Sequence, residues 1–544
     1  MLRKINRMWG VFIWLLVIGL LVYSRFVNLD WGLPYPMHPD ERNMATAIQG
    51  LNCVISNFEF RISNFRECGN PHFFAYGQLP LYLGYGIVWL MKINPTLALR
   101  IISAIASIIT TIIIIKIINF VSKKENNWMA WLAVIFSPYA IQLAHFGTTE
   151  SLLMMFYSAV VYLSLIYSDN RIHNSKFIIL NSFFCGLAIA TKMSAVIFLV
   201  VPAVSIIVLS FRAKSRNLFV RSLHALRLVG MTIVVSFFFA LIFSPHNLLN
   251  WQEFLSSMRY ESDVALGKTL VFYMRQFVGT VQVWFQLTKV FPYALGWGIG
   301  LIGLIGLMGV GWRDRKINFL RLAFFVYFLP NAFLFAKWVR FMAPVFPILT
   351  VFAILLILNI KNEISKIHIK YQKVLHFALS SLFLLFYFLI LLPGINYLTI
   401  YLKPDVRFQA SEWIYKNIPE NSYILSETAN VVDIPVELPS YKFHKVYKVV
   451  SFNFYDLDES PDLQKELKDH LEKADYIFVP SRRIFANLNG RYPRLKEYYD
   501  NLFSGRLGFE KVAEFSAGLS DENSEETWSV FDHPVIRIYK KVKS

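Results

Sequence analysis

The sequence predicts a helical protein with about eleven membrane spans, followed by a small α/β domain outside the membrane. Three observations predict this fold class. Hydrophobic residues make up 56% of the 544 residues and the mean hydropathy is +0.45, so the chain has more apolar surface than a soluble core of this length could bury. Apolar runs of membrane-spanning length recur along the chain. After Gly394 the composition becomes that of a soluble domain.

Each predicted span is a run of roughly 17 to 24 apolar residues, because a helix of about that length crosses a hydrocarbon core of about 30 Å. No cleavage site of small residues follows the first run, so we expect a membrane helix there rather than a signal peptide. The runs cover residues 9–27, 97–120, 128–145, 150–167, 193–211, 228–245, 293–311, 319–335, 341–359 and 374–395, with a shorter run at 177–191.

Lysine and arginine decide the orientation of these spans. The formal net charge is +18, but the basic residues gather in short segments between apolar runs, which indicates topology signals and no nucleic-acid partner. If the apolar segment 79–91 is a juxtamembrane or re-entrant element, those basic segments are cytoplasmic. We therefore expect an integral, multi-pass protein of the cell (plasma) membrane. Its N-terminus would be cytoplasmic and its C-terminal domain extracytoplasmic, with long outer loops at about 28–96 and 246–292.

Two domains are expected, a membrane module over residues 1–395 and a soluble extracytoplasmic α/β domain over 396–544. The second domain has helix-like runs at 406–417 and 463–473 and strand-like runs at 423–425, 446–452, 476–479 and 535–539. Its acidic segment 521–526 is interpreted as a solvated loop. In the outer loop 246–292, aromatic and basic residues alternate, which indicates helices in the plane of the membrane interface that could cover a site.

The three cysteines are too few for a disulfide scaffold, and their spacing fits neither zinc binding nor thiol redox chemistry. Cys53 and Cys68 share the first outer loop, and the sequence leaves open whether they form a disulfide or stay unpaired. Cys185 lies inside an apolar run, where we expect an inert thiol.

Candidate acids lie on the predicted outer side. Asp40 and Glu41 stand together at the predicted start of a helix, where the helix dipole favours acids, so a purely structural role stays open. Glu150 lies between two spans, and carboxylates at such positions are rare and usually functional. Its structural alternative is a charge at the N-terminus of the span that follows.

Three cations fall on the same side, namely Lys192, Lys337 and Arg340. A cation buried at the outer rim of the membrane needs an anion, and a lipid phosphate is a natural one. Snorkelling to lipid headgroups is the alternative for each of them. Because the chain has no Walker or Rossmann glycine loop, we expect a donor dissolved in the membrane rather than a nucleotide.

Several motifs resemble the GT-C membrane glycosyltransferases of family 39, which include protein O-mannosyltransferases and the aminoarabinose transferases of lipid A. The resemblance covers nearly the whole chain, although each motif alone is weak. It rests on the segments that begin at His38, Asn70, His145, Ala190, Phe243, Lys337, Arg407 and Phe531, among them His38-Pro39-Asp40-Glu41, His145-Phe-Gly-Thr-Thr-Glu150 and Lys337-Trp-Val-Arg340.

The resemblance implies a GT-C fold and a polyprenyl-phosphate-sugar donor, with Asp40 as the catalytic acid-base residue. Glu150 stands where family members often have Asp, which leaves its role open between substrate orientation and metal binding. The same motifs supply residues that would bind or position substrate: His38, Arg42, His72, Tyr76 and His145. No cofactor is required, but a divalent metal could bind Asp40 and Glu150.

These features predict an inverting glycosyltransferase that moves a sugar from a polyprenyl-phosphate donor to an acceptor hydroxyl on a protein, lipid or glycan. Asp40 would accept the proton of the hydroxyl, a nearby Glu41 or Glu150 would raise its basicity, and the three cations would neutralise the leaving phosphate. A transporter or flippase of a lipid-linked sugar is the main alternative. It would favour an internal repeat and ionisable residues near mid-span, which the sequence does not show. The third hypothesis is a lipid-anchored binding or scaffold protein.

Overall fold

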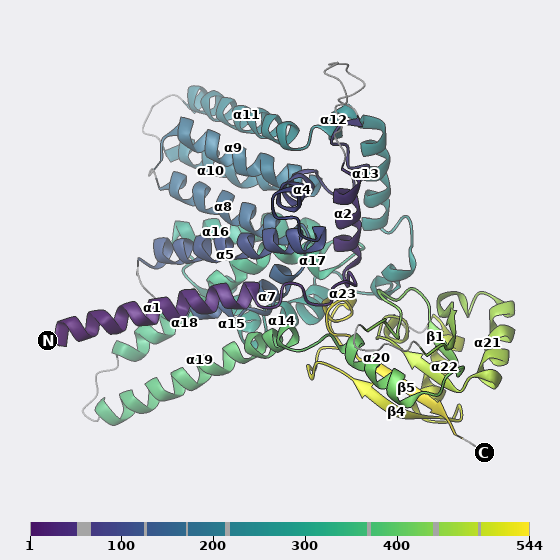
Figure 1. Ribbon diagram of the computed structural model, residues 1–544. Helices are drawn as coiled ribbons and strands as arrows, with labels where there is room; N and C mark the ends of the chain where they lie inside the picture. The colour runs from purple at the N-terminus through teal and green to yellow at the C-terminus, as the bar shows by residue number, and fades with distance from the viewer. Residues whose placement is uncertain are drawn as a thin grey trace.

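The computed structural model describes residues 2–51, 67–123, 128–169, 172–212, 218–366, 372–438, 445–487 and 491–542. A bundle of helices is followed by a smaller domain with a five-stranded sheet, which packs against one end of the bundle (Figure 1). The predicted fold class, a helical membrane module followed by an α/β domain, is confirmed.

The helices of the membrane module begin and end as follows: α1 Leu2–Phe26, α2 Pro39–Gly50, α4 Leu79–Met91, α5 Pro95–Ser122, α6 Trp128–Ile135, α7 Pro138–His145, α8 Glu150–Ser168, α9 Asn174–Thr191, η1 Met193–Leu199, α10 Val200–Arg212, α11 Leu218–Phe243, α12 His246–Leu249, α13 Trp251–Ala265, η2 Phe272–Phe277, η3 Gln286–Val290, α14 Phe291–Ala294, α15 Trp297–Gly309, α16 Arg315–Ala332, α17 Val339–Met342, η4 Ala343–Val345, α18 Phe346–Lys366 and α19 Gln372–Leu402.

Every predicted span falls on helix, although several of these helices are short or broken. Within the described residues, 7 helices are long and apolar enough to cross a membrane. The number rises to 8 if the helical segments Gln286–Ala294 and Trp297–Gly309, which are bent by 119° relative to each other, form one broken span. The predicted span 128–145 is two short helices, α6 and α7, and Leu79–Met91 is a shorter apolar helix. α19 and α11 expose most of their apolar side chains on the outside of the bundle, as lipid-facing helices do.

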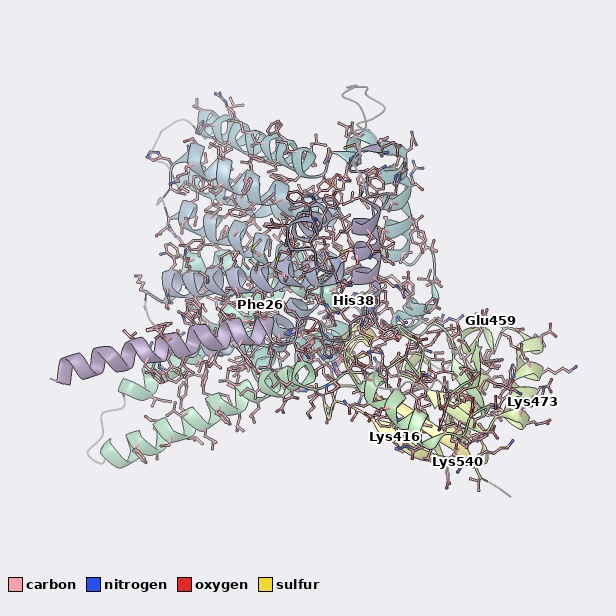
Figure 2. All side chains as sticks on the ribbon, in the orientation of Figure 1. Phe26, His38, Lys416, Glu459, Lys473 and Lys540 are labelled. Atoms are coloured by element: carbon pink, nitrogen blue, oxygen red, sulfur yellow. The ribbon has the colours of Figure 1, made fainter. Side chains whose placement is uncertain are left out.

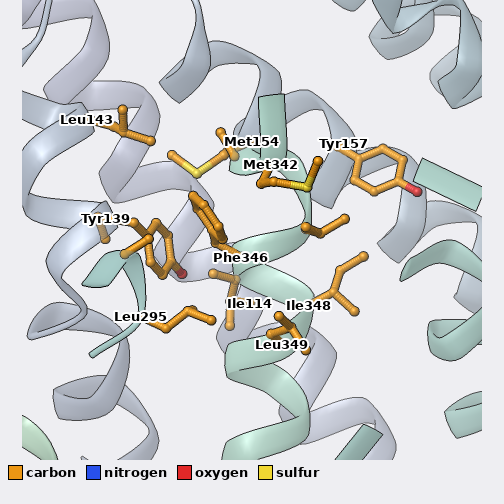
Figure 3. Packing of buried hydrophobic residues seen from close by; sticks show 14 of the residues in the cluster. Ile114, Tyr139, Leu143, Met154, Tyr157, Leu295, Met342, Phe346, Ile348 and Leu349 are labelled. Carbon is orange, nitrogen blue, oxygen red and sulfur yellow. The ribbon is translucent and has the colours of Figure 1, made fainter. Parts of the chain in front are cut away.

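The core of the module surrounds α18, the most buried of the candidate spans. Figure 3 shows Met154 of α8 and Met342 of α17 packed around Phe346 at the start of α18. α15 approaches α18 closely, because a Cβ atom at Gly306 would lie 2.5 Å from the carbonyl oxygen of Phe352. Small residues at such crossings let membrane helices meet backbone to backbone.

The C-terminal domain consists of α20 Val406–Asn417, β1 Tyr423–Glu427, β2 Lys448–Phe452, η5 Phe454–Asp456, α21 Pro461–Lys473, β3 Tyr476–Val479, η6 Phe485–Asn487, α22 Pro493–Phe503, β4 Phe509–Phe515, α23 Glu526–Ser529 and β5 Ile536–Lys541. The strand order is β2-β1-β3-β5-β4. β1 is parallel to β2 and β3, whereas β5 is antiparallel to β3 and β4. Four of these strands match the strand-like runs in the sequence, and β4 was not predicted.

The acidic segment 521–526 is not a solvated loop, so that interpretation was wrong. Asp521, Glu525 and Glu526 are buried where the C-terminal domain meets the membrane module. The Glu525 carboxylate accepts hydrogen bonds from the side chain of Gln276 (2.8 Å) and the backbone N–H of Val339 (3.1 Å). Partners on distant parts of the chain offset the cost of burying these charges.

Candidate active site

The motif that begins at His38 starts helix α2. The His38 ring caps the helix, because its Nδ1 accepts a hydrogen bond from the backbone N–H of Asp40 at 3.2 Å. The ring packs between Phe146 of the membrane module (4.8 Å between ring centroids) and Phe531 of the C-terminal domain (4.4 Å). Figure 2 shows His38 where the two domains meet. Burial, and then the charge of Arg340, holds the pKa of His38 well below its usual value, so the ring is neutral at pH 7.

Asp40, in the first turn of α2, forms an ion pair with Arg340 of α17. The pair is partly accessible, with exposed side-chain fractions of 18% for Asp40 and 22% for Arg340. The guanidinium carbon of Arg340 also lies 4.7 Å from the centre of the Trp338 ring. The Nε of Arg340 is buried and has no hydrogen-bond partner. One donor of this arginine therefore has unused hydrogen-bonding capacity.

Glu41, one residue further on, has a different environment. Its carboxylate accepts two hydrogen bonds from Arg100 of α5, at 2.6 and 2.9 Å, and a third from the backbone N–H of Gly147 at 2.8 Å. The same guanidinium donates to the carbonyl oxygens of Leu29 (2.8 Å) and Trp31 (2.6 Å). Both charged side chains are buried, at 0% and 1% exposed. This pair fastens the segment between α1 and α2, and the start of α2, to the bundle.

Glu150 and Lys192 form a third pair, with 3.5 Å between Oε1 and Nζ. The Lys192 ammonium lies 5.0 Å from the centre of the Tyr76 ring and 5.4 Å from that of Phe341, the residue after Arg340. The backbone of the Tyr76 loop is held by a 2.9 Å hydrogen bond from Gly77 N–H to the Thr191 carbonyl. Arg340 also lies near the Phe341 ring, with 6.0 Å between its guanidinium carbon and the ring centre. Lys192 and Arg340, two of the three predicted phosphate-binding cations, therefore lie around the same aromatic ring.

A cavity of about 310 Å³ lies beside Asp40, between the bundle and the C-terminal domain. Its walls come from α2, the loop before α4, α13, η2, the segment before and in α17, and the C-terminal domain. It is lined by Pro39, Asp40, Asn43, Phe73, Ala75, Tyr76, Tyr260, Glu261, Val264, Tyr273, Trp338, Arg340, Arg483, Glu526, Thr527 and Phe531. Burial raises the pKa of Glu261, an effect that nearby Lys192 opposes. The cavity thus combines carboxylates, guanidinium groups and aromatic rings.

Other predicted site residues lie away from this cavity. Lys337 is buried and donates a 2.9 Å hydrogen bond to the Phe335 carbonyl, and burial lowers its pKa. The two ring nitrogens of His145 lie within 2.9 Å of backbone carbonyls, and its ring stacks on Tyr401. Arg42 is exposed on α2, and His72 is 59% exposed beside Glu67 and Glu253. Of the predicted positioning residues, the structure brings Tyr76 to the cavity and His38 beside it.

Three residues of this region were missed by sequence reasoning. Arg100 gave a usable signal, since a charged residue inside an apolar run is rare and needs a partner. Arg483 and Glu526 gave none, because they lie 43 residues apart in the sequence and meet only in the fold, where Arg483 Nε donates to Glu526 at 2.5 Å.

Metal binding and disulfide formation were both left open by the sequence. Within the described part of the chain, no group of three or more His, Cys, Asp or Glu side chains is arranged to hold a metal ion. Asp40 and Glu150, the suggested metal ligands, each pair with a cation. Cys68 is disulfide-bonded and Cys185 is a free, buried thiol, whereas Cys53 lies outside the described residues.

Residues 79–243, from α4 to the end of α11, match the family model of dolichyl-phosphate-mannose-protein mannosyltransferase. This match confirms the resemblance for the part of the chain that carries Glu150 and Lys192. No protein of curated function matches the chain in sequence.

Three solved structures align with much or part of this chain at low sequence identity. ArnT from Cupriavidus metallidurans in the apo state has 12% sequence identity and a TM-score of 0.47, covering 98% of this chain and 98% of that one. The archaeal oligosaccharyltransferase AglB from Archaeoglobus fulgidus, in complex with an inhibitory peptide and a dolichol-phosphate, has 11% identity and a TM-score of 0.47, covering 91% of this chain and 72% of that one. The S. cerevisiae Pmt1-Pmt2 complex bound to the sugar donor has 14% identity and a TM-score of 0.32, covering 44% of this chain and 34% of that one.

Proposed function

We propose that this protein is an inverting glycosyltransferase that moves a sugar from a polyprenyl-phosphate donor to an acceptor hydroxyl at the outer face of the membrane. One observation carries the proposal. Asp40, a carboxylate at the start of a helix, lines a cavity at the end of a membrane bundle and pairs there with Arg340, which keeps an unpartnered donor. The match of residues 79–243 to a family of lipid-phosphate-mannose-dependent transferases supports the same chemistry.

The geometry supports a simple sequence of steps. The acceptor hydroxyl gives its proton to the Asp40 carboxylate while its oxygen attacks the anomeric carbon of the donor sugar. The bond from that carbon to the phosphate oxygen breaks, and its electrons leave with the polyprenyl phosphate. Attack opposite the leaving group inverts the anomeric configuration. No covalent sugar-enzyme intermediate is needed.

Arg340 links donor binding to the basicity of Asp40. Without a ligand, the guanidinium stabilises the Asp40 carboxylate, which makes the carboxylate a weaker base. A donor phosphate that takes hydrogen bonds from Arg340 draws away part of this stabilisation. The carboxylate then becomes a better base only when the donor is present. Lys192, which shares the Phe341 ring with Arg340, adds a second positive charge against the phosphate.

The orientation of the protein is part of the proposal. The basic segments between spans support a cytoplasmic N-terminus, and the C-terminal domain and the cavity would then face the outside of the plasma membrane. A cysteine in place of Lys473, at the far side of the C-terminal domain, should react with a membrane-impermeant maleimide in intact cells (Figure 2). A cysteine in place of Arg313 should react only after permeabilisation.

The deciding experiment is sugar transfer by the purified protein. Radiolabelled polyprenyl-phosphate sugars are incubated with a membrane extract, and label is followed into protein, lipid and glycan fractions. General-base assistance contributes about 10²- to 10⁴-fold, so Asp40→Asn should lower turnover by that factor while the donor still binds.

The matched control is Asp30→Asn, which removes an exposed acid from the same outer loop and should leave transfer unchanged. Full transfer by folded Asp40→Asn protein would rule out the mechanism. If wild-type protein moves intact labelled lipid across a bilayer but cleaves none of it, the protein is a flippase instead.

A further inference from the structure

The parallel strands of the C-terminal domain end at the candidate cavity. Arg483, after β3, lines the cavity, and its guanidinium donates a 2.7 Å hydrogen bond to the Ala429 carbonyl, after β1. Tyr455, after β2, packs its ring 4.9 Å from Phe272 of the membrane module. In open sheets of parallel strands, ligands bind at the carboxyl ends of the strands. This edge of the sheet faces the cavity that Asp40 lines.

Buried polar atoms at this edge have hydrogen-bonding capacity left over. Glu526 lines the cavity and is 2% exposed, and its Oε2 has no hydrogen-bond partner, although its Oε1 accepts from Arg483. Behind it, the Tyr455 hydroxyl and the Glu427 Oε2 are also buried without partners. A buried polar group without a partner is costly, so native proteins keep such groups mainly where a ligand or water satisfies them.

We propose that Arg483 and Glu526 form a subsite of the C-terminal domain that binds the hydroxyl groups of a sugar ring, across the cavity from Asp40. A sugar ring presents several hydroxyls that both donate and accept, which suits a guanidinium next to a free carboxylate oxygen. The aromatic rings of Tyr260, Tyr273 and Trp338 line the same cavity and supply apolar surface for the faces of the ring.

Other ligands fit this edge less well. A second phosphate would meet the negative charge of Glu526, and an apolar side chain would leave the Oε2 of Glu526 unsatisfied.

Burial raises the pKa of Glu427 to about 8, so the Glu427 carboxyl is protonated at pH 7 and can itself donate a hydrogen bond. The sugar could belong to the donor or to a glycan acceptor, because both meet at Asp40.

This inference rests on the proposed function, and its test uses the full-length protein in detergent. Glu526→Asp keeps the charge that pairs with Arg483 but withdraws the free oxygen from the cavity, and Glu526→Gln is the second variant. Glu510→Gln, an exposed acid of β4, is the control. Three quantities are measured for each variant: the KM for the sugar-bearing donor, the Kd of n-octyl mannoside, and the Kd of undecaprenyl phosphate without a sugar. Thermal unfolding confirms that each variant is folded.

We expect Glu526→Asp to raise the donor KM or the octyl mannoside Kd at least tenfold, since a hydrogen bond to a charged group is lost. The Kd of undecaprenyl phosphate should change less than twofold. A change in the donor value alone identifies the donor sugar as the occupant, and a change in the glycoside value identifies the acceptor. Unchanged values, or an equal change in all three, would overturn the subsite. Wild-type protein that cleaves no donor would overturn the proposed function and this inference with it.

Discussion

Asp40 and Glu41 are neighbours in one helical turn, yet the structure places them in opposite environments. Asp40 is partly exposed, lines a cavity and pairs with an arginine that keeps a free donor. Glu41 is fully buried, and Arg100 and Gly147 satisfy it with three hydrogen bonds. A group that handles substrate needs access and spare hydrogen-bonding capacity, whereas a structural group needs neither. The comparison supports the proposal that Asp40 carries the chemistry, with Glu41 as an anchoring group.

The largest effect should come from breaking the anchoring pair. Glu41→Gln leaves the Arg100 guanidinium buried without its counter-charge, and removing one partner of a buried ion pair costs about 3–5 kcal/mol. We expect much less folded protein and a lower unfolding temperature in detergent. The double variant Glu41→Leu with Arg100→Met should regain part of this stability, because no charge stays unpaired.

The Asp40→Asn variant tests the other acid. It should lower turnover, and it should lower the unfolding temperature much less than Glu41→Gln does. If instead Glu41→Gln folds normally and loses turnover as Asp40→Asn does, the two acids act as a catalytic unit and the division between them is wrong.

The second effect separates the two cations that share a motif, Arg340 and Lys337. Arg340 lines the cavity, whereas Lys337 is buried and bonded to the Phe335 carbonyl. A hydrogen bond to a charged group contributes about 1.5–3 kcal/mol, so Arg340→Ala should raise the donor KM roughly 10- to 100-fold. Lys337→Ala should lower the unfolding temperature and leave the donor KM of the folded fraction unchanged. Equal increases in donor KM would return Lys337 to the phosphate site.

Much of this architecture could be predicted because it depends on local patterns. Apolar runs produced the helices of the bundle, and the Pro39-Asp40-Glu41 sequence starts a helix, as proline and acids in a first turn favour. β4 was missed because it is an edge strand whose Glu and Lys residues stay exposed, so little apolar signal marks it.

The rest depends on contacts between distant segments. The acidic segment 521–526 looked like a solvated loop because charges usually stay in water. It is buried because Arg483, Gln276 and His533 meet it in three dimensions, and the first two of these partners lie far from it in the sequence. The separation of Asp40 from Glu41 was equally hidden, since it depends on Arg100 and Arg340, which reach the helix from distant parts of the sequence.

A third acid-base cluster has a histidine as its cation. His533 donates hydrogen bonds to Asp532 (2.6 Å) and Asp521 (2.8 Å), and Asp532 also accepts from Tyr397 and Tyr401 of α19. The cluster therefore fastens the C-terminal domain to the bundle. Burial alone would lower the pKa of His533, but the two carboxylates outweigh it and raise the pKa to about 10.

This raised pKa predicts the smallest effect, a loss of stability in mild alkali. The folded state holds the proton more tightly than the unfolded state, whose histidine pKa is about 6.5, so the stabilisation is complete below pH 6.5 and declines as the pH rises towards 10. Between pH 6.5 and 8 the loss should be about 1–2 kcal/mol. The unfolding temperature of wild-type protein should fall over that interval, whereas His533→Gln should start lower and give a flatter profile. A pH profile that is equally steep in His533→Gln would place the sensitivity elsewhere and remove His533 as the titrating link between the domains.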